Sequence, residues 1–252
     1  IRDHHESLER MRLAMEHGEF VLHYQPKVNM RSGKVIGAEA LMRWQHPEKG
    51  LLYPDSFLFM FDQTGMHREL GEYVIDAALS QLEAWAGDDN LHLSVSVNIA
   101  AQHLQRPDFA LHLRDILQRH PTVSPHLLEL EIVETAALQD LAQVSERISE
   151  CRKLGVQFAI DDFGTGYSSL SYLKQLPMQT LKIDRSFVHD MLDDPDDLAI
   201  VEGVIGLTKA FGRKVIAEGV ESAEHGMVLL QLGCDLAQGY GIARPMPGAD
   251  FP

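Results

Sequence analysis

The chain has 252 residues, of which 45% are hydrophobic and 23% charged, and its formal net charge is −15. This length fits one α/β barrel as well as two small domains, and the acidic balance argues against general DNA or RNA binding, which needs a basic surface. A small anionic substrate remains compatible with this charge if bound cations supply the positive field.

The first predicted elements are a helix and a hairpin. Residues 3–17 have the pattern of an amphipathic helix, and we expect residues 1–18 to link to an upstream sensor domain, with residues 19–252 forming the folded unit. Residues 20–28 and 34–44 are rich in β-forming residues and are separated by a Met-Arg-Ser-Gly turn, which predicts an antiparallel pair.

The rest of the chain alternates helix-like and strand-like segments. Helices are predicted over 54–61, 70–85, 108–119, 138–154, 169–176, 197–211 and 223–232. Strands are predicted over 91–99, 127–133, 156–160, 180–183, 214–217 and 234–237. About eight strands in one domain of this length favour a TIM-like (β/α)8 barrel of the α/β class, in which the initial hairpin makes one strand antiparallel.

Several common sites are excluded by missing motifs. Cys151 and Cys234 form no CxxC pattern, so we expect two reduced, buried thiols and a cytoplasmic domain, although the full-length protein could be anchored to a membrane. No GxSxG elbow, P-loop or HExxH sequence is present. No apolar run reaches the length of a membrane span.

The most informative motif is Asp161-Asp162-Phe163-Gly164-Thr165-Gly166, which follows the apolar strand predicted over 156–160. Two adjacent carboxylates repel one another unless positive charge lies beside them. The glycines allow a sharp turn. The motif therefore fits a divalent-metal site beside a movable loop, and taken alone it fits an ordinary turn or helix cap equally well.

Polar residues also occur at the other predicted strand ends, where the active sites of such barrels lie. They are Glu39, Asn98, Glu131, Glu134, Lys182, Asp184, Glu218, Glu221 and Gln238. Any one of them could be a surface residue or a cap, but their recurrence predicts one converging cluster. Hard oxygen ligands favour Mg²⁺ or Mn²⁺ over zinc.

Five motifs in order are similar to those of the EAL-domain family, whose members are phosphodiesterases that hydrolyse cyclic di-GMP to linear pGpG. The motifs are Glu39-Ala40-Leu41-Met42-Arg43-Trp44, the block from Asp161 to Leu170, Lys182-Ile183-Asp184, Glu218-Gly219-Val220-Glu221 and Gln238-Gly239-Tyr240. The resemblance extends over about residues 19–247 and implies a (β/α)8 barrel with one antiparallel strand, in agreement with the pattern of elements.

The resemblance also implies the metal ligands and the catalytic residues. The expected ligands of a first divalent cation, Mg²⁺ or Mn²⁺, are Glu39, Asn98, Glu131 and Asp161. The expected ligands of a second are Asp161, Asp162 and Glu218, with Asp161 shared. Lys182 is expected to hold or help activate the attacking water, so Glu39, Asp161, Lys182 and Glu218 are the expected catalytic residues.

Further roles follow from the same resemblance. The expected substrate contacts are Gln25, Arg43, Asp184 and Gln238, with Arg43 facing a phosphate. Glu221 and Gln238 are expected beside the metals. Glu134 is expected to anchor the flexible loop that contains Gly164, Thr165 and Gly166. The expected partners are cyclic di-GMP, a second copy of the chain in a homodimer, and an upstream sensor, with no DNA or RNA polymer.

Two positions depart from the family pattern. Ala100 stands where the family often has serine, and Val133 where it often has threonine. Each removes a hydroxyl near a site residue, and we expect this to affect rate and loop control more than activity itself. A catalytically weak or silent cyclic di-GMP receptor is the alternative function, and an unrelated two-metal barrel enzyme of the enolase type is a third possibility that the motifs disfavour.

Overall fold

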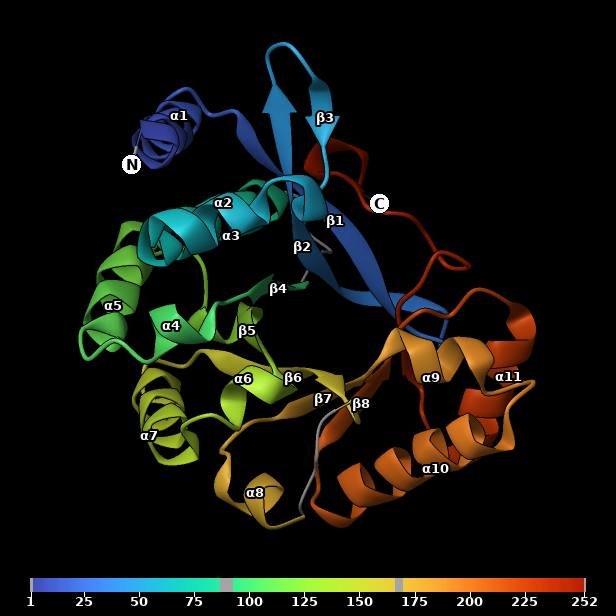
Figure 1. Ribbon diagram of the computed structural model, residues 1–252. Helices are drawn as coiled ribbons and strands as arrows, with labels where there is room; N and C mark the ends of the chain where they lie inside the picture. The colour runs from blue at the N-terminus through green and yellow to red at the C-terminus, as the bar shows by residue number, and fades with distance from the viewer. Residues whose placement is uncertain (1, 87–92, 166–169, 252) are drawn as a thin grey trace.

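The computed structural model describes residues 2–86, 93–165 and 170–251, and within them eight strands close into a barrel surrounded by helices (Figure 1). In order around the barrel they are β1 (Phe20–Asn29), β2 (Lys34–His46), β4 (Ser94–Asn98), β5 (Leu128–Val133), β6 (Gln157–Phe163), β7 (Thr180–Ile183), β8 (Lys214–Ala217) and β9 (Leu236–Ala237). Strand β1 is antiparallel to both β2 and β9, whereas the other neighbours are parallel. The predicted (β/α)8 barrel with one antiparallel strand is confirmed.

Two further short strands were not predicted from the sequence. Strand β3 (Gly50–Leu52) pairs with the end of β2, and β10 (Met246–Pro247) pairs with β1. Both are too short to give a pattern of alternating apolar residues.

Helices cover the outside of the barrel (Figure 1). They are α1 (Arg2–Glu16), α2 (Leu58–Thr64), α3 (His67–Trp85), α4 (Ala101–Leu104), α5 (Phe109–Arg119), α6 (Glu134–Ala137), α7 (Leu141–Arg152), α8 (Leu170–Gln175), α9 (Arg185–Asp190), α10 (Pro195–Ala210) and α11 (Ala223–Leu232). Single 3-10 turns lie at Pro54–Ser56, Pro125–Leu127 and Gly248–Asp250.

Two predicted helices begin differently in the structure. The segment 54–61 becomes a 3-10 turn followed by α2, and the helix predicted over 138–154 is α7, which begins at Leu141 after the separate helix α6 ends at Ala137. Helix α7 has its own start because the Asp140 carboxylate accepts a hydrogen bond from the backbone N–H of Gln143 at 3.1 Å. An Asp cap of this kind marks a new helix N-terminus inside an otherwise continuous helical pattern.

Alternation along the strands separates the core from the barrel interior. On β5, Leu128, Leu130 and Ile132 are fully buried in the apolar core. The intervening Glu129 and Glu131 point into the barrel, where both contact lysine ammonium groups. The sequence therefore places apolar side chains against the helices and a polar set inside the barrel.

Outside the barrel, α1 packs on the domain, because Met11 and Ala14 are completely buried in its core. Cys151 and Cys234 are both free and buried, as predicted. Among the described residues, no helix is long and apolar enough to cross a membrane.

Candidate active site

The acid pair lies inside β6, not after it, which corrects the predicted strand end at residue 160. The pairing of β6 with β7 passes from Ile160 opposite Leu181 to Phe163 opposite Ile183, so Asp161 and Asp162 together lie opposite Lys182. This is a β-bulge, which bends a strand and redirects its side chains. Consecutive strand residues normally point to opposite faces, and the bulge lets both carboxylates approach the same site.

Asp162 has a strained backbone. Its φ of 54° makes it the one non-glycine residue with positive φ in the part of the chain that the structure describes. Aspartate tolerates this left-handed region better than most residues, yet the conformation still costs free energy and is typical of functional sites. The strain is offset by local hydrogen bonds, since the Asp161 carboxylate accepts one from the Asp162 N–H at 3.1 Å.

The acids form two groups that share one member. In the first carboxylate group, oxygens of Glu39, Glu131 and Asp161 all lie within 4.8 Å of one another. In the second carboxylate group, the same is true of Asp161, Asp162 and Glu218. The structure thus brings together five of the six predicted metal ligands around Asp161, from strands β2, β5 and β6 and from the end of β8.

Lys182 lies between the two groups. Its fully buried Nζ is 2.6 Å from Glu131, 2.7 Å from Glu218, 3.1 Å from Asp161 and 3.3 Å from Glu39. Burial disfavours the ammonium ion, but the surrounding carboxylates, Glu131 foremost, hold the pKa of Lys182 well above its ordinary value. Lys182 is therefore a fixed positive charge at the centre of the site.

The acids still outnumber the positive charges. Burial raises the pKa of Glu39, and repulsion from Glu131 and Asp161 raises it further. Burial and repulsion likewise raise the pKa of Glu218 well above its usual range, and that of Asp162 to about 6. Carboxylate oxygens that repel one another at this separation are the donor set that hard divalent cations bind, so the residues present fit such cations.

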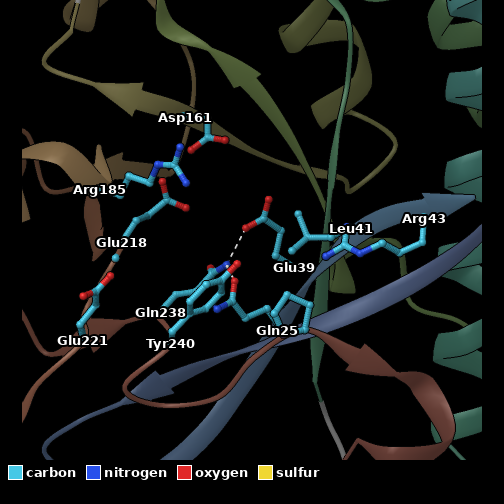
Figure 2. Close-up of a pocket in the computed structure, with 13 residues that line it drawn as sticks. Gln25, Glu39, Leu41, Arg43, Asp161, Arg185, Glu218, Glu221, Gln238 and Tyr240 are labelled. Carbon is cyan, nitrogen blue, oxygen red and sulfur yellow. Dashed lines mark hydrogen bonds between the residues drawn. The ribbon is translucent and has the colours of Figure 1, made fainter. Parts of the chain in front are cut away.

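Amide side chains surround Glu39. Asn98, the remaining predicted ligand, donates from Nδ2 to Glu39 Oε1 at 2.8 Å, which leaves its carbonyl oxygen free of that bond. Gln238 Nε2 donates to Glu39 Oε2 at 2.6 Å and to Gln25 Oε1 at 2.9 Å (Figure 2). These bonds connect β1, β2, β4 and the residue after β9, and they fix the orientation of the Glu39 carboxylate.

The loop after the acid pair is tied to β5. Buried Glu134 accepts a hydrogen bond from the backbone N–H of Gly164 at 2.9 Å, and Thr165 Oγ1 donates to the carbonyl of Asp162 at 2.8 Å. Gly164 has φ of 105°, which favours glycine, and an added Cβ would lie 3.0 Å from Phe187. Gly166, also predicted for this loop, lies outside the described residues.

A cavity of about 280 Å³ opens beside these groups. Its lining includes the predicted residues Gln25, Glu39, Arg43, Asp161, Glu218, Glu221 and Gln238. Arg43 is buried at 5% exposure, and its guanidinium lies 4.9 Å from the centre of the Tyr53 ring. Figure 2 shows Arg185 on the opposite side of the cavity, beside Asp161 and Glu218.

Arg185 was not predicted from the sequence. It begins α9, directly after the Lys182-Ile183-Asp184 motif, and it lines the cavity. Gly219 makes room for it, because an added Cβ there would lie 2.7 Å from the Arg185 Cβ. Its position directly after a strand of the barrel could have suggested a role in binding, but an arginine at the start of a helix is also typical of a protein surface.

Asp184 has a different place from the one expected. It is absent from the cavity lining, and its carboxylate caps α9 by accepting a hydrogen bond from Ser186 N–H at 2.9 Å. It also interacts with the Asp162 side chain, which raises the pKa of Asp162. In this structure Asp184 therefore contacts Asp162 and caps α9, and it does not line the cavity.

The two departures from the family pattern lie at helix N-caps. Ala100 precedes α4 and Val133 precedes α6, both with extended backbone and without a side-chain cap. A serine or threonine hydroxyl could accept a hydrogen bond from the helix N-terminus at each position. The missing hydroxyls thus affect the caps of two short helices that follow Asn98 and Glu131.

Comparison with known protein families finds a match over most of the chain. The family described as EAL domain matches residues 8–245 of the chain. The chain is 40% identical over 240 residues to the bifunctional diguanylate cyclase/cyclic di-GMP phosphodiesterase MucR of Pseudomonas aeruginosa, covering 95% of this chain and 35% of that protein. The chain thus spans about a third of the length of this curated relative.

Solved structures have the same fold. The PaMucR phosphodiesterase in complex with c-di-GMP aligns with a TM-score of 0.90 at 40% identity, covering 96% of this chain and 98% of that one. The FimX EAL domain from Pseudomonas aeruginosa bound to c-di-GMP aligns with a TM-score of 0.87 at 27% identity, covering 95% and 96%. With the family match over nearly the whole sequence, these results show that the chain belongs to the EAL-domain family.

Proposed function

We propose that this chain is an active phosphodiesterase that hydrolyses cyclic di-GMP to linear pGpG with the help of two divalent cations. The observation that carries the proposal is the pair of carboxylate groups that share Asp161 at the edge of the cavity. The relatives named as cyclic di-GMP phosphodiesterases support the choice of substrate.

The proposed cation ligands are the residues that the structure brings together. Glu39, Asn98, Glu131 and Asp161 would hold one cation, and Asp161, Asp162 and Glu218 the other. When bound, Mg²⁺ or Mn²⁺ would supply an acidified water and positive charge at the attacking and leaving oxygens.

The protein's own cations complete the site. Lys182 is held within 3.3 Å of four carboxylates, so its ammonium is fixed at the centre of the cluster, where it would orient a water once bound cations take over some of these carboxylates. Arg43 and Arg185 line the cavity on its two sides and are suited to bind the two phosphates of a cyclic dinucleotide. In this way an acidic protein would bind an anionic substrate.

Cation binding should weaken in acid. The Asp162 carboxyl, with its pKa raised to about 6 by burial and by Asp161, binds a proton that a cation must displace. Because protonation increases as pH falls through this value, and because the pKa values of Glu39 and Glu218 are raised as well, affinity for Mn²⁺ should fall about tenfold or more between pH 7.5 and pH 5. Calorimetric titration of the metal-free protein at pH 5 and pH 7.5 tests this, and equal affinities would contradict it.

Arg185→Ala should raise KM for cyclic di-GMP about tenfold or more, because a hydrogen bond from arginine to a phosphate contributes about 1.5–3 kcal/mol. The turnover number should change less, since Lys182 and the acids stay in place. The matched control is Arg114→Ala, which removes an exposed arginine on α5. A KM unchanged in Arg185→Ala would exclude Arg185 from substrate binding.

The wider assembly is part of the same proposal. We expect the chain to form a homodimer and residues 1–18 to connect it to an upstream sensor in the full-length protein. Light scattering of the purified chain tests the dimer, and a monomer whose activity is independent of protein concentration would contradict it.

The direct test of function is incubation of the purified chain with cyclic di-GMP and Mg²⁺, with and without EDTA. We expect pGpG to accumulate only in the presence of Mg²⁺. Saturable binding of cyclic di-GMP without pGpG, in excess Mg²⁺ or Mn²⁺, would identify a silent receptor instead.

A further inference from the structure

A second layer of polar residues lies inside the barrel, two residues along the strands from Lys182 and three of the proposed cation ligands. We call Lys27, Ser96, Glu129 and Thr180 the floor cluster. Ser96, Glu129 and Thr180 precede Asn98, Glu131 and Lys182 by two residues, and Lys27 pairs with Gly37, two residues before Glu39. Barrel interiors are usually filled by branched aliphatic side chains, so this layer is unusual.

The floor cluster is closely hydrogen-bonded. Lys27 Nζ lies 3.1 Å from Glu129 Oε1 and 2.9 Å from Glu131 Oε1, and it also donates to Ser96 Oγ. Glu129 accepts from Ser96 at 2.7 Å and from Thr180 at 2.9 Å. Lys27 extends from β1 across the interior to β5, and only 2% of its side chain is exposed.

Glu131 is consequently held at both of its oxygens. Oε1 accepts a hydrogen bond from Lys27 of the floor cluster, and Oε2 accepts one from Lys182 of the candidate active site at 2.6 Å. Within the described residues, no other carboxylate of the two groups contacts two lysines. Lys27 therefore occupies one Glu131 oxygen and leaves Oε2 as the oxygen that contacts Lys182 in the site.

A buried ion pair of this kind is poor evidence for stability, because removing two charges from water offsets their attraction. The presence of Lys27 here is better explained by geometry. From its contacts, and resting on the proposed function, we propose that Lys27 is a positioning residue that fixes Glu131 as a one-oxygen ligand of the first cation.

The alternative is that Lys27 only neutralises Glu129. Two variants separate these roles: Lys27→Met, and Lys27→Met combined with Glu129→Gln. The double variant removes both charges of the pair but keeps an acceptor for Ser96 and Thr180, so we expect it to fold even if the single variant does not. Lys34→Met, an exposed lysine at the start of β2, is the matched control.

The decisive measurement is calorimetric titration of the metal-free proteins with Mn²⁺. If Lys27 positions Glu131, the double variant should unfold like wild type yet bind one Mn²⁺ about tenfold or more weakly, with kcat reduced and KM unchanged. Wild-type affinity in the double variant would overturn the proposal, since Lys27 would then only offset Glu129. Tighter binding by the double variant would also overturn it, because loss of the contact between Lys27 and Glu131 would then favour the cation and would not misplace its ligand.

This test does not depend on catalysis by the variants. If the wild-type chain fails to hydrolyse cyclic di-GMP, the proposed function is wrong, while the Mn²⁺ titration still decides whether Lys27 positions Glu131.

Discussion

Asp161→Asn should lower kcat/KM for cyclic di-GMP about 10³-fold, the largest loss expected from any one carboxylate. Asp161 is the member shared by both carboxylate groups, so an amide here removes charge and one acceptor oxygen from each. Lys182 also loses one of its four carboxylate partners. Initial rates of pGpG formation in Mg²⁺ measure the catalytic effect, and Mn²⁺ titration should find both sites weakened.

Asp162→Asn provides the comparison, because Asp162 belongs to the second carboxylate group alone. This variant should weaken one Mn²⁺ site and leave the other near its wild-type affinity. Asp193→Asn, an exposed residue between α9 and α10, controls for the change of charge. Equal metal-binding profiles in Asp161→Asn and Asp162→Asn would contradict the sharing of Asp161.

Lys182→Met should abolish measurable hydrolysis and also destabilise the cation-free protein by about 3 kcal/mol or more. The fully buried ammonium contacts four carboxylates, and its removal leaves them to repel one another in a low-dielectric interior. Divalent cations should restore part of this loss, so Mg²⁺ should stabilise the variant more than it stabilises the wild type.

Urea unfolding of the two proteins in EDTA and in Mg²⁺ measures these differences. Lys153→Met, an exposed lysine at the end of α7, is the matched control and should match the wild type in both conditions. Unchanged stability of Lys182→Met in EDTA would show that the acids do not need the lysine charge.

The barrel could be predicted because apolar residues recur with a different period in its strands than in its helices. The alternation over 20–28 and 34–44 predicted the β1–β2 pair, and the later strands follow helical segments at regular intervals. The end of β6 could not be predicted, since the bulge at Asp161 depends on pairing with β7 and leaves no mark in local composition.

Sequence motifs located the two carboxylate groups but not the floor cluster or Arg185. Glu39, Glu131 and Asp161 were found because acids within otherwise apolar strands are unexpected. Lys27 was missed because its partners are distant in sequence: it contacts Glu129 and Glu131, 102 and 104 residues away. Arg185 was missed because an arginine at the start of a helix is typical of a protein surface. A search two residues from each strand-end acid would have found Glu129, since side chains on one face of a strand repeat at that spacing.

The reaction proposed for this chain is hydrolysis of a phosphodiester bond by attack of water on phosphorus. The most direct measurement is incubation with cyclic di-GMP and Mg²⁺ in ¹⁸O-labelled water, followed by mass spectrometry of the products. We expect linear pGpG carrying one ¹⁸O atom, located in its terminal 5′-phosphate. Recovery of intact, unlabelled cyclic di-GMP from protein saturated with ligand and Mg²⁺ would contradict it.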